Sequence, residues 1–193
     1  MVLHAEAKHI VQKIRARWID LLEHPGETEE AYHSYLAAHA GMFLSDGCYK
    51  IPVISKLRLG ADLVTDFVTT IDRASYGFTY EFIEIETPNS APYIQSGAPS
   101  SRLTGAVQQI QNWQLWLDAN RSEAKKLFPS KEFIYFDRPS FTFTIIIGRR
   151  DDSQQWLHLR NNYSQRLGIE IQIMQGFGIA SQNNQYQAQG TPK

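Results

Sequence analysis

Three acidic residues stand in two strand-like segments of otherwise apolar sequence: Asp66 in Leu63–Thr70, and the pair Glu84 and Glu86 in Phe78–Thr87. Side chains alternate along an extended strand, so Glu84 and Glu86 project from one face, and Asp66 on a neighbouring strand can point into the same space. Carboxylates held so close repel one another unless a cation lies between them. Because oxygen ligands suit a hard divalent ion, the three acids predict a Mg²⁺ or Mn²⁺ site.

The alternative reading of the same pattern is a solvated strand face, because glutamate is common on exposed strands. Against it stand the flanking residues, which are nearly all apolar: Val64, Phe67, Val68, Phe82, Ile83 and Ile85. A strand with such neighbours is buried on at least one side, and an unpaired buried carboxylate is costly. The residues therefore favour the metal site over the solvated face.

Composition limits the classes of function open to the chain. Its 193 residues suffice for one domain with a sizeable core, and 42% hydrophobic with 20% charged residues describes an ordinary globule. A net charge of −1 supplies no global attraction to nucleic acid, so any such binding must use local basic patches. The single cysteine, Cys48, fits a reducing compartment. With no apolar run of about 20 residues and no signal-peptide pattern, we expect a cytoplasmic protein without a membrane partner.

Helical periodicity predicts three main helices around the acids. Residues 5–23 form an amphipathic pattern that ends at Pro25-Gly26, and Thr28 can cap a second helix from Glu29 to about Ala40. Ser101 or Thr104 can cap a third helix that runs through Asn120 and is rich in amides, including Gln109. These amides are either a solvated polar face or donors that reach a phosphate or a water.

Further strand patterns complete the expected fold. They are an irregular strand over Lys50–Gly60 with a turn at Gly60, then Phe133–Phe136, Phe141–Gly148 and Ile169–Ile173, with a short helix around Ser153–Asn161 and a long loop over Pro88–Ser101. The expectation is a single α/β domain whose mixed sheet of about five strands is flanked by helices, with Phe141–Ile147 near the centre. The expected divisions are an N-terminal helix (1–27), the main domain (28–180) and a disordered tail (181–193).

Glu29 is a fourth acidic candidate. It precedes Tyr32 by three positions and Leu36 by seven, so it shares their inward face and can serve a site. Its place in the first helical turn also suits the helix dipole, which is the simpler explanation. The basic residues are scattered and form only small clusters, of the kind usually found on solvated faces.

An Asp on one strand, a Glu-x-acid on the next and a Gln on the following helix resemble the core of the PD-(D/E)xK nuclease superfamily. Within it the chain is similar to the Shedu family of anti-phage defence nucleases. The similarity runs from about Thr28 to Ile173 and rests on four segments in order: 60–67, 82–88, 103–113 and 145–149. It implies a restriction-endonuclease-like core.

The resemblance also implies roles for individual residues. Asp66 and Glu84 match the metal-binding acids, and Gln109 matches the glutamine of the following helix. Glu29 or Glu30 can supply the acid that the superfamily often adds from an N-terminal helix, and Glu29 has the better face. Glu86 is the departure, because it stands where the pattern normally has a lysine. It would act as a general base or hold a further metal ion, as in members of the superfamily that use Glu-x-Glu.

The implied activity is Mg²⁺- or Mn²⁺-dependent hydrolysis of DNA by a homo-oligomer. Contacts to the DNA backbone would come from basic side chains: Arg102, Lys125, Lys126, Arg149 and Arg150. Two other classes of function stay open. One is a catalytically silent DNA-binding module whose metal site is degraded by Glu86, and the other is an oligomeric interaction scaffold.

Overall fold

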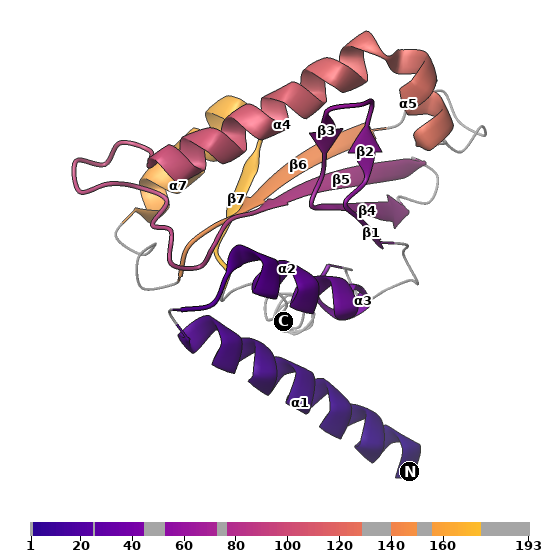
Figure 1. The fold of residues 1–193 in the computed structure, drawn as a ribbon, viewed down its shortest axis with the longest axis vertical. Coiled ribbons are helices and arrows are strands. Elements are labelled where there is room, and N and C mark those ends of the chain that lie inside the picture. The colour runs from indigo at the N-terminus through magenta and orange to yellow at the C-terminus, as the bar shows by residue number, and fades with distance from the viewer. Residues whose placement is uncertain are drawn as a thin grey trace, which may run out of the picture.

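A five-stranded mixed sheet forms the middle layer of the molecule (Figure 1). The computed structural model describes residues 2–24, 26–44, 53–72, 77–128, 140–149 and 156–174. The strands lie in the order β1 (Val53–Ser55), β4 (Phe67–Asp72), β5 (Phe78–Ile85), β6 (Ser140–Ile146) and β7 (Glu170–Gln172). The pairs β1–β4 and β4–β5 are antiparallel, whereas β5–β6 and β6–β7 are parallel. The predicted α/β class and mixed sheet are confirmed, with β6 hydrogen-bonded on both sides.

Helices cover both faces of this sheet (Figure 1). One layer contains α4 (Ser101–Ala119), α5 (Arg121–Leu127) and α7 (Leu157–Leu167). The other layer contains three helices: α1 (Val2–Glu23), α2 (Glu29–Ala38) and α3 (Ala40–Phe43). No helix in the described part of the chain is both long enough and apolar enough to cross a bilayer.

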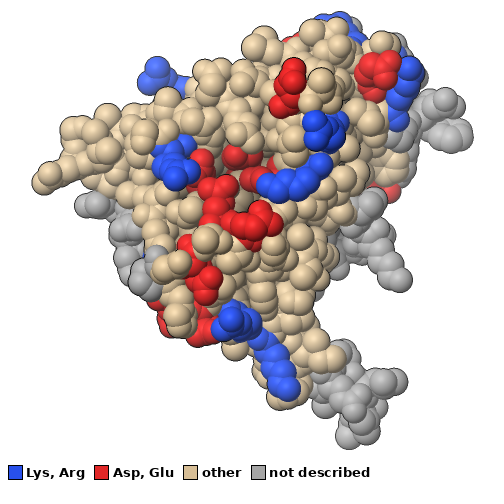
Figure 2. Space-filling view, in the orientation of Figure 1, with Lys and Arg blue, Asp and Glu red and all other residues tan. Residues whose placement is uncertain are grey.

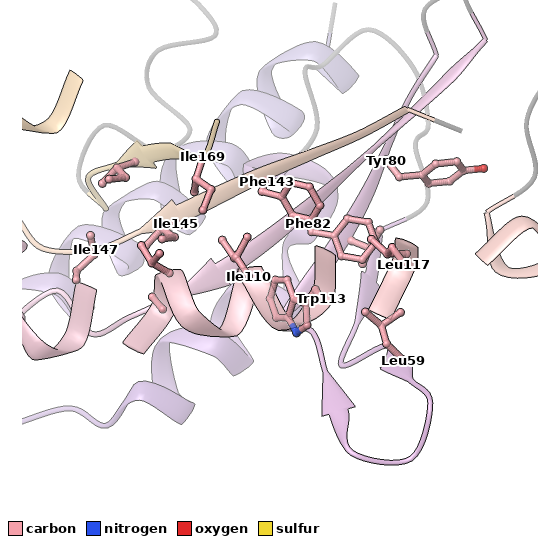
Figure 3. Close-up of a cluster of buried hydrophobic side chains, with 14 of the residues drawn as sticks. Leu59, Tyr80, Phe82, Ile110, Trp113, Leu117, Phe143, Ile145, Ile147 and Ile169 are labelled. Atoms are coloured by element: carbon pink, nitrogen blue, oxygen red, sulfur yellow. The ribbon is translucent and has the colours of Figure 1, made fainter. Parts of the chain in front are cut away.

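The larger core lies between the sheet and α4 (Figure 3). Every member of the apolar stripe of α4 is buried: Leu103, Ala106, Val107, Ile110, Trp113 and Leu117. Trp113 is fully buried, and its ring centroid lies 6.1 Å from that of Phe82 on β5. An aromatic side chain buries about 150–250 Å², which at about 25 cal/mol per Å² contributes roughly 4–6 kcal/mol to the free energy of folding. This packing holds α4 across the strand that carries Glu84.

The predicted N-cap is confirmed for α2 and wrong for α4. Thr28 caps α2 as predicted, with its hydroxyl accepting from the Ala31 N–H at 3.3 Å. The predicted cap of α4 is wrong, because Ser100, not Ser101 or Thr104, accepts from the Leu103 N–H at 3.2 Å.

Two further elements differ from the patterns. The strand expected over Leu63–Thr70 is interrupted at Asp66, because β3 (Leu63–Val64) belongs to a separate two-stranded sheet. The helix expected around Ser153–Asn161 is α7, which runs on to Leu167 and ends at Gly168 in a left-handed cap with φ 64°. Other predictions fall outside the described residues: the strand Phe133–Phe136 and the tail 181–193. Cys48 also lies outside them.

Candidate metal centre

A fold-back at Gly60 sets the position of Asp66. β2 (Arg58–Leu59) pairs antiparallel with β3 (Leu63–Val64) around this turn. The same register brings Lys56 level with Asp66, and the Lys56 N–H donates to the Asp66 carbonyl at 2.9 Å. Asp66 therefore lies where the chain passes from the small sheet into the main one.

The carboxylate of Asp66 is held at both oxygens. Oδ2 accepts from the Ile85 N–H at 2.8 Å, and Oδ1 accepts from Lys56 Nζ at 2.6 Å. Phe67 is paired with Ile83 across β4 and β5, so Asp66 comes next to Glu84 on the adjoining strand. Directly opposed residues of antiparallel strands have Cβ atoms about 4.5–5.5 Å apart, which places the two acids within reach of a shared cation.

Glu84 lies on the face of β5 that is covered by α4. Its Oε2 accepts from Gln109 Nε2 at 2.8 Å. Burial, together with the nearby charges of Asp66 and Glu86, raises the pKa of Glu84 from 4.5 to about 10. Without a compensating cation, this carboxyl group is therefore protonated at neutral pH.

Glu86 follows the end of β5, and Arg102 links it to the helix layer on the other side. Arg102 Nη1 lies 3.5 Å from Glu86 Oε2 and 3.8 Å from Glu29 Oε2. Burial and the charge of Glu29 raise the pKa of Glu86 to about 7, while Arg102 works to lower it. The contact with Arg102 is electrostatic, because Glu86 Oε2 is buried and has no hydrogen-bond partner among the described residues.

Burial decides between the two readings of the three acids. The exposed fractions of Asp66, Glu84 and Glu86 are 7%, 7% and 8%, so the solvated-face alternative is wrong. On the face of the molecule shown in Figure 2, acidic side chains gather in the middle and basic side chains lie on either side.

The donors are of the chemical type that suits a hard divalent cation. All of its members are carboxylates, one buried oxygen of Glu86 lacks a hydrogen bond within the described structure, and a cation would relieve the repulsion that raises the pKa of Glu84. In the described ranges, however, no three His, Cys, Asp or Glu side chains are arranged as a ready metal cage. Nitrogen donors from Lys56, Gln109 and Arg102 hold the acids instead.

The remaining candidate residues lie at different distances from this cluster. Glu29 joins it through Arg102, whereas Glu30 accepts a hydrogen bond from Ser34 at 3.1 Å. Lys125 and Lys126 lie on α5, at the end of α4 opposite to Arg102 (Figure 1).

The guanidinium group of Arg149 is not exposed in the way expected of a side chain that binds phosphate. Its Nε and Nη2 are buried without a hydrogen-bond partner in the described structure. It is close to Tyr32 of α2, whose pKa burial raises and the charge of Arg149 opposes. Arg150 lies outside the described residues.

Lys56 is the site residue that the sequence reasoning missed. Burial works to lower its pKa, but the hydrogen bond and charge of Asp66, together with the charges of Glu30 and Glu84, outweigh that effect and leave the pKa raised. A signal was present, because a hairpin that turns near Gly60 brings residues equally distant from the turn into register. His33 was also missed; it is buried, stacks on Phe67 at 4.6 Å and has Nε2 3.5 Å from the Asp66 carbonyl oxygen.

Comparison with known families gives one match. The model of the family described as "Shedu protein SduA, C-terminal" matches residues 26–174, which is more than half of the chain and includes all the acids of the site. No curated protein matches the chain.

Proposed function

The chain belongs to the family of Shedu SduA C-terminal domains, which suggests a role in anti-phage defence, and from this premise we propose that it is a metal-dependent DNA endonuclease. The observation that carries the proposal is the buried cluster of Asp66, Glu84 and Glu86, with a raised pKa at two of them and one oxygen of Glu86 without a hydrogen bond in the described structure. Strongly perturbed acids gathered in one place are typical of catalytic sites.

Each residue has a distinct part in the proposed reaction. Asp66 and Glu84, with Glu29 beside them, would hold Mg²⁺ or Mn²⁺, which when bound lowers the pKa of water and draws charge from a phosphate. Gln109 fixes the orientation of Glu84 through its amide N–H.

Glu86 is the proton acceptor, because its pKa of about 7 suits a general base at neutral pH. As the water oxygen bonds to phosphorus, the water proton passes to Glu86. The bond from phosphorus to the leaving oxygen breaks, and that oxygen takes a proton from solvent. The products are a 5′ or 3′ phosphate end and a free hydroxyl.

DNA is the proposed partner, bound through its phosphates. Arg102 lies beside the acids, and Lys125 and Lys126 lie beyond the other end of α4, a 19-residue helix that is about 28 Å long. A duplex that contacts both ends of α4 would make phosphate contacts on either side of the scissile bond, so its affinity for the protein should fall steeply with salt concentration.

We also propose that the protein is a homo-oligomer, which light scattering on the purified protein tests directly.

The first test is DNA cleavage by the wild type and a matched pair of variants. Asp66→Asn removes a charged metal ligand, and Asp62→Asn makes the same change at an exposed position four residues away. With Mg²⁺ or Mn²⁺ and plasmid or linear DNA, we expect Asp66→Asn to lose about a thousandfold in rate, which corresponds to about 4 kcal/mol of transition-state stabilisation. Asp62→Asn should cut like the wild type.

The outcomes distinguish the proposed enzyme from the two alternatives, a catalytically silent DNA-binding module and an interaction scaffold. Equal cleavage by wild type and Asp66→Asn would remove Asp66 from the reaction. No cleavage by the wild type, together with salt-sensitive DNA binding measured by fluorescence anisotropy, would indicate the silent DNA-binding module. Neither cleavage nor DNA binding would indicate the interaction scaffold.

A further inference from the structure

The backbone at Lys56 is strained. Among the residues that the structure describes, Lys56 is the one non-glycine residue with a positive φ, at 53°. Such a conformation is costly for a residue that has a Cβ atom and free of cost for glycine, and it is found where the surrounding structure or the function demands it. Here it occurs where the chain leaves β1 of the main sheet and enters β2 of the small one.

This backbone conformation accompanies a side chain that reaches the acid cluster. Lys56 Nζ lies 2.6 Å from Asp66 Oδ1, and the side chain remains 47% exposed. An ammonium group has three N–H donors, and Asp66 is the one acceptor that the described structure gives it. Two donors therefore remain for a ligand that approaches the acids from solvent.

The composition of the cluster explains why such a donor is needed. The charges of Asp66, Glu86 and Glu29 all act on Glu84, and a phosphodiester that enters brings further negative charge. Arg102 lies between Glu29 and Glu86, so its charge is shared by two acids. In the described structure Lys56 makes a close ion pair with one acid, Asp66, while the charges of Glu30 and Glu84 act on it from further away. More of its charge is therefore available to meet a phosphate.

We propose that Lys56 is the phosphate-contacting cation of this site: one N–H stays on Asp66 Oδ1, and the others donate to a non-bridging oxygen of the scissile phosphate. The inference rests on the proposed function and deepens it. Lys56 keeps its proton throughout, so it makes and breaks no covalent bond. Its contribution is a fixed positive charge where negative charge develops in the transition state.

A purely structural role for Lys56 predicts different effects when the side chain is removed. An ion pair with so exposed an ammonium contributes little to stability, and the backbone strain acts against it. If Lys56 only held Asp66 in place for the metal, its loss would weaken metal binding. If it contacts phosphate, its loss removes a cation that competes for Asp66, so metal binding is unchanged or tighter.

The test compares Lys56→Gln with Lys56→Arg and with Lys13→Gln, which makes the same change at an exposed position on α1. The measurements are kcat and KM for cleavage of linear DNA, Mn²⁺ affinity by calorimetry, and the salt dependence of DNA binding with Ca²⁺ in place of Mg²⁺. For Lys56→Gln we expect kcat to fall about 100-fold or more, as when one donor to a developing oxyanion is removed. The slope of log affinity against log salt should become shallower by about 0.9, the value expected when the protein neutralises one phosphate fewer.

Lys56→Arg should recover part of the rate and the full salt slope, since its charge is kept, and Lys13→Gln should match the wild type in every measurement. Cleavage by Lys56→Gln within threefold of the wild type would overturn the inference and leave the nuclease intact. Weaker Mn²⁺ binding by Lys56→Gln would overturn it in favour of a structural role. If the wild type itself does not cut, the proposed function fails, and the salt slope alone then decides: a shallower slope supports the phosphate contact and an unchanged slope overturns it.

Discussion

Replacing Glu84 by glutamine should make the metal-free protein more stable at neutral pH. Burial, with the charges of Asp66 and Glu86, raises the pKa of Glu84 from 4.5 to about 10. The unfolded chain loses this proton near its ordinary pKa, while the folded protein keeps it up to about pH 10. Folding at pH 7 therefore takes up a proton, and the wild type loses stability as pH rises through this window.

The size of the effect follows from the same pKa. Each pH unit above 4.5 lowers the free energy of unfolding of the wild type by about 1.4 kcal/mol, so the loss at pH 7 is about 3 kcal/mol. Glutamine has no charge to lose, and its amide oxygen can still accept from Gln109. We expect Glu84→Gln to be more stable than the wild type by about 2–3 kcal/mol at pH 7, with the difference shrinking towards pH 4.5.

The assay is urea unfolding in EDTA at several pH values between about 5 and 8, the window in which this penalty grows. Unfolding is followed by tryptophan fluorescence, to which the buried Trp18 and Trp113 contribute. The control is Glu81→Gln on the same strand, because the Glu81 carboxylate accepts hydrogen bonds from Thr144 at 2.6 Å and Thr69 at 3.4 Å and should gain nothing from neutralisation. Added Mg²⁺ should stabilise the wild type and not Glu84→Gln, since a ligand that binds only the folded state raises its stability.

Two results would refute this reasoning. One is a Glu84→Gln protein that is less stable than the wild type at pH 7 in EDTA. The other is a gain in stability that does not change with pH, because a gain from protonation must shrink as the pH approaches the ordinary pKa of a glutamate.

Two more predictions concern stability and the pH dependence of the reaction. Gly60→Ala should lower the free energy of unfolding, measured by thermal unfolding, by about 1–3 kcal/mol, because φ is 68° and the new Cβ would lie 2.7 Å from Trp116 Nε1. Gly105→Ala, at an open position inside α4, should raise it by about 0.5–1 kcal/mol. Equal effects of the two changes would contradict the packing around Gly60. Arg102→Gln should raise the pKa of Glu86 further above about 7 and move the rising limb of the cleavage rate to higher pH, because Arg102 works to lower that pKa; an unmoved profile would exclude Glu86 as the base.

Elements with a local pattern could be predicted from the amino-acid sequence. The apolar stripe of α4 and the alternation along β5 follow from the periods of helix and strand, so the burial of Trp113 and the shared face of Glu84 and Glu86 could be derived from spacing alone. The same spacing placed Gln109 on the helix that crosses Glu84. Where the pattern was weak, as at the end of α7, the boundary was misplaced.

Which charged side chains come into contact depends on how the layers of the fold pack. Lys56 reaches Asp66 because a hairpin turns near Gly60 and the backbone at Lys56 adopts a left-handed conformation. The turn could be predicted from the sequence, whereas no periodic pattern encodes the left-handed conformation. Arg102 joins Glu29 to Glu86 because α2 and α4 both approach the end of β5. The pKa values depend on the burial and neighbours that result. Charge interactions fall with distance in space, whereas sequence patterns report distance along the chain, so the electrostatics of this site emerge only when the layers pack.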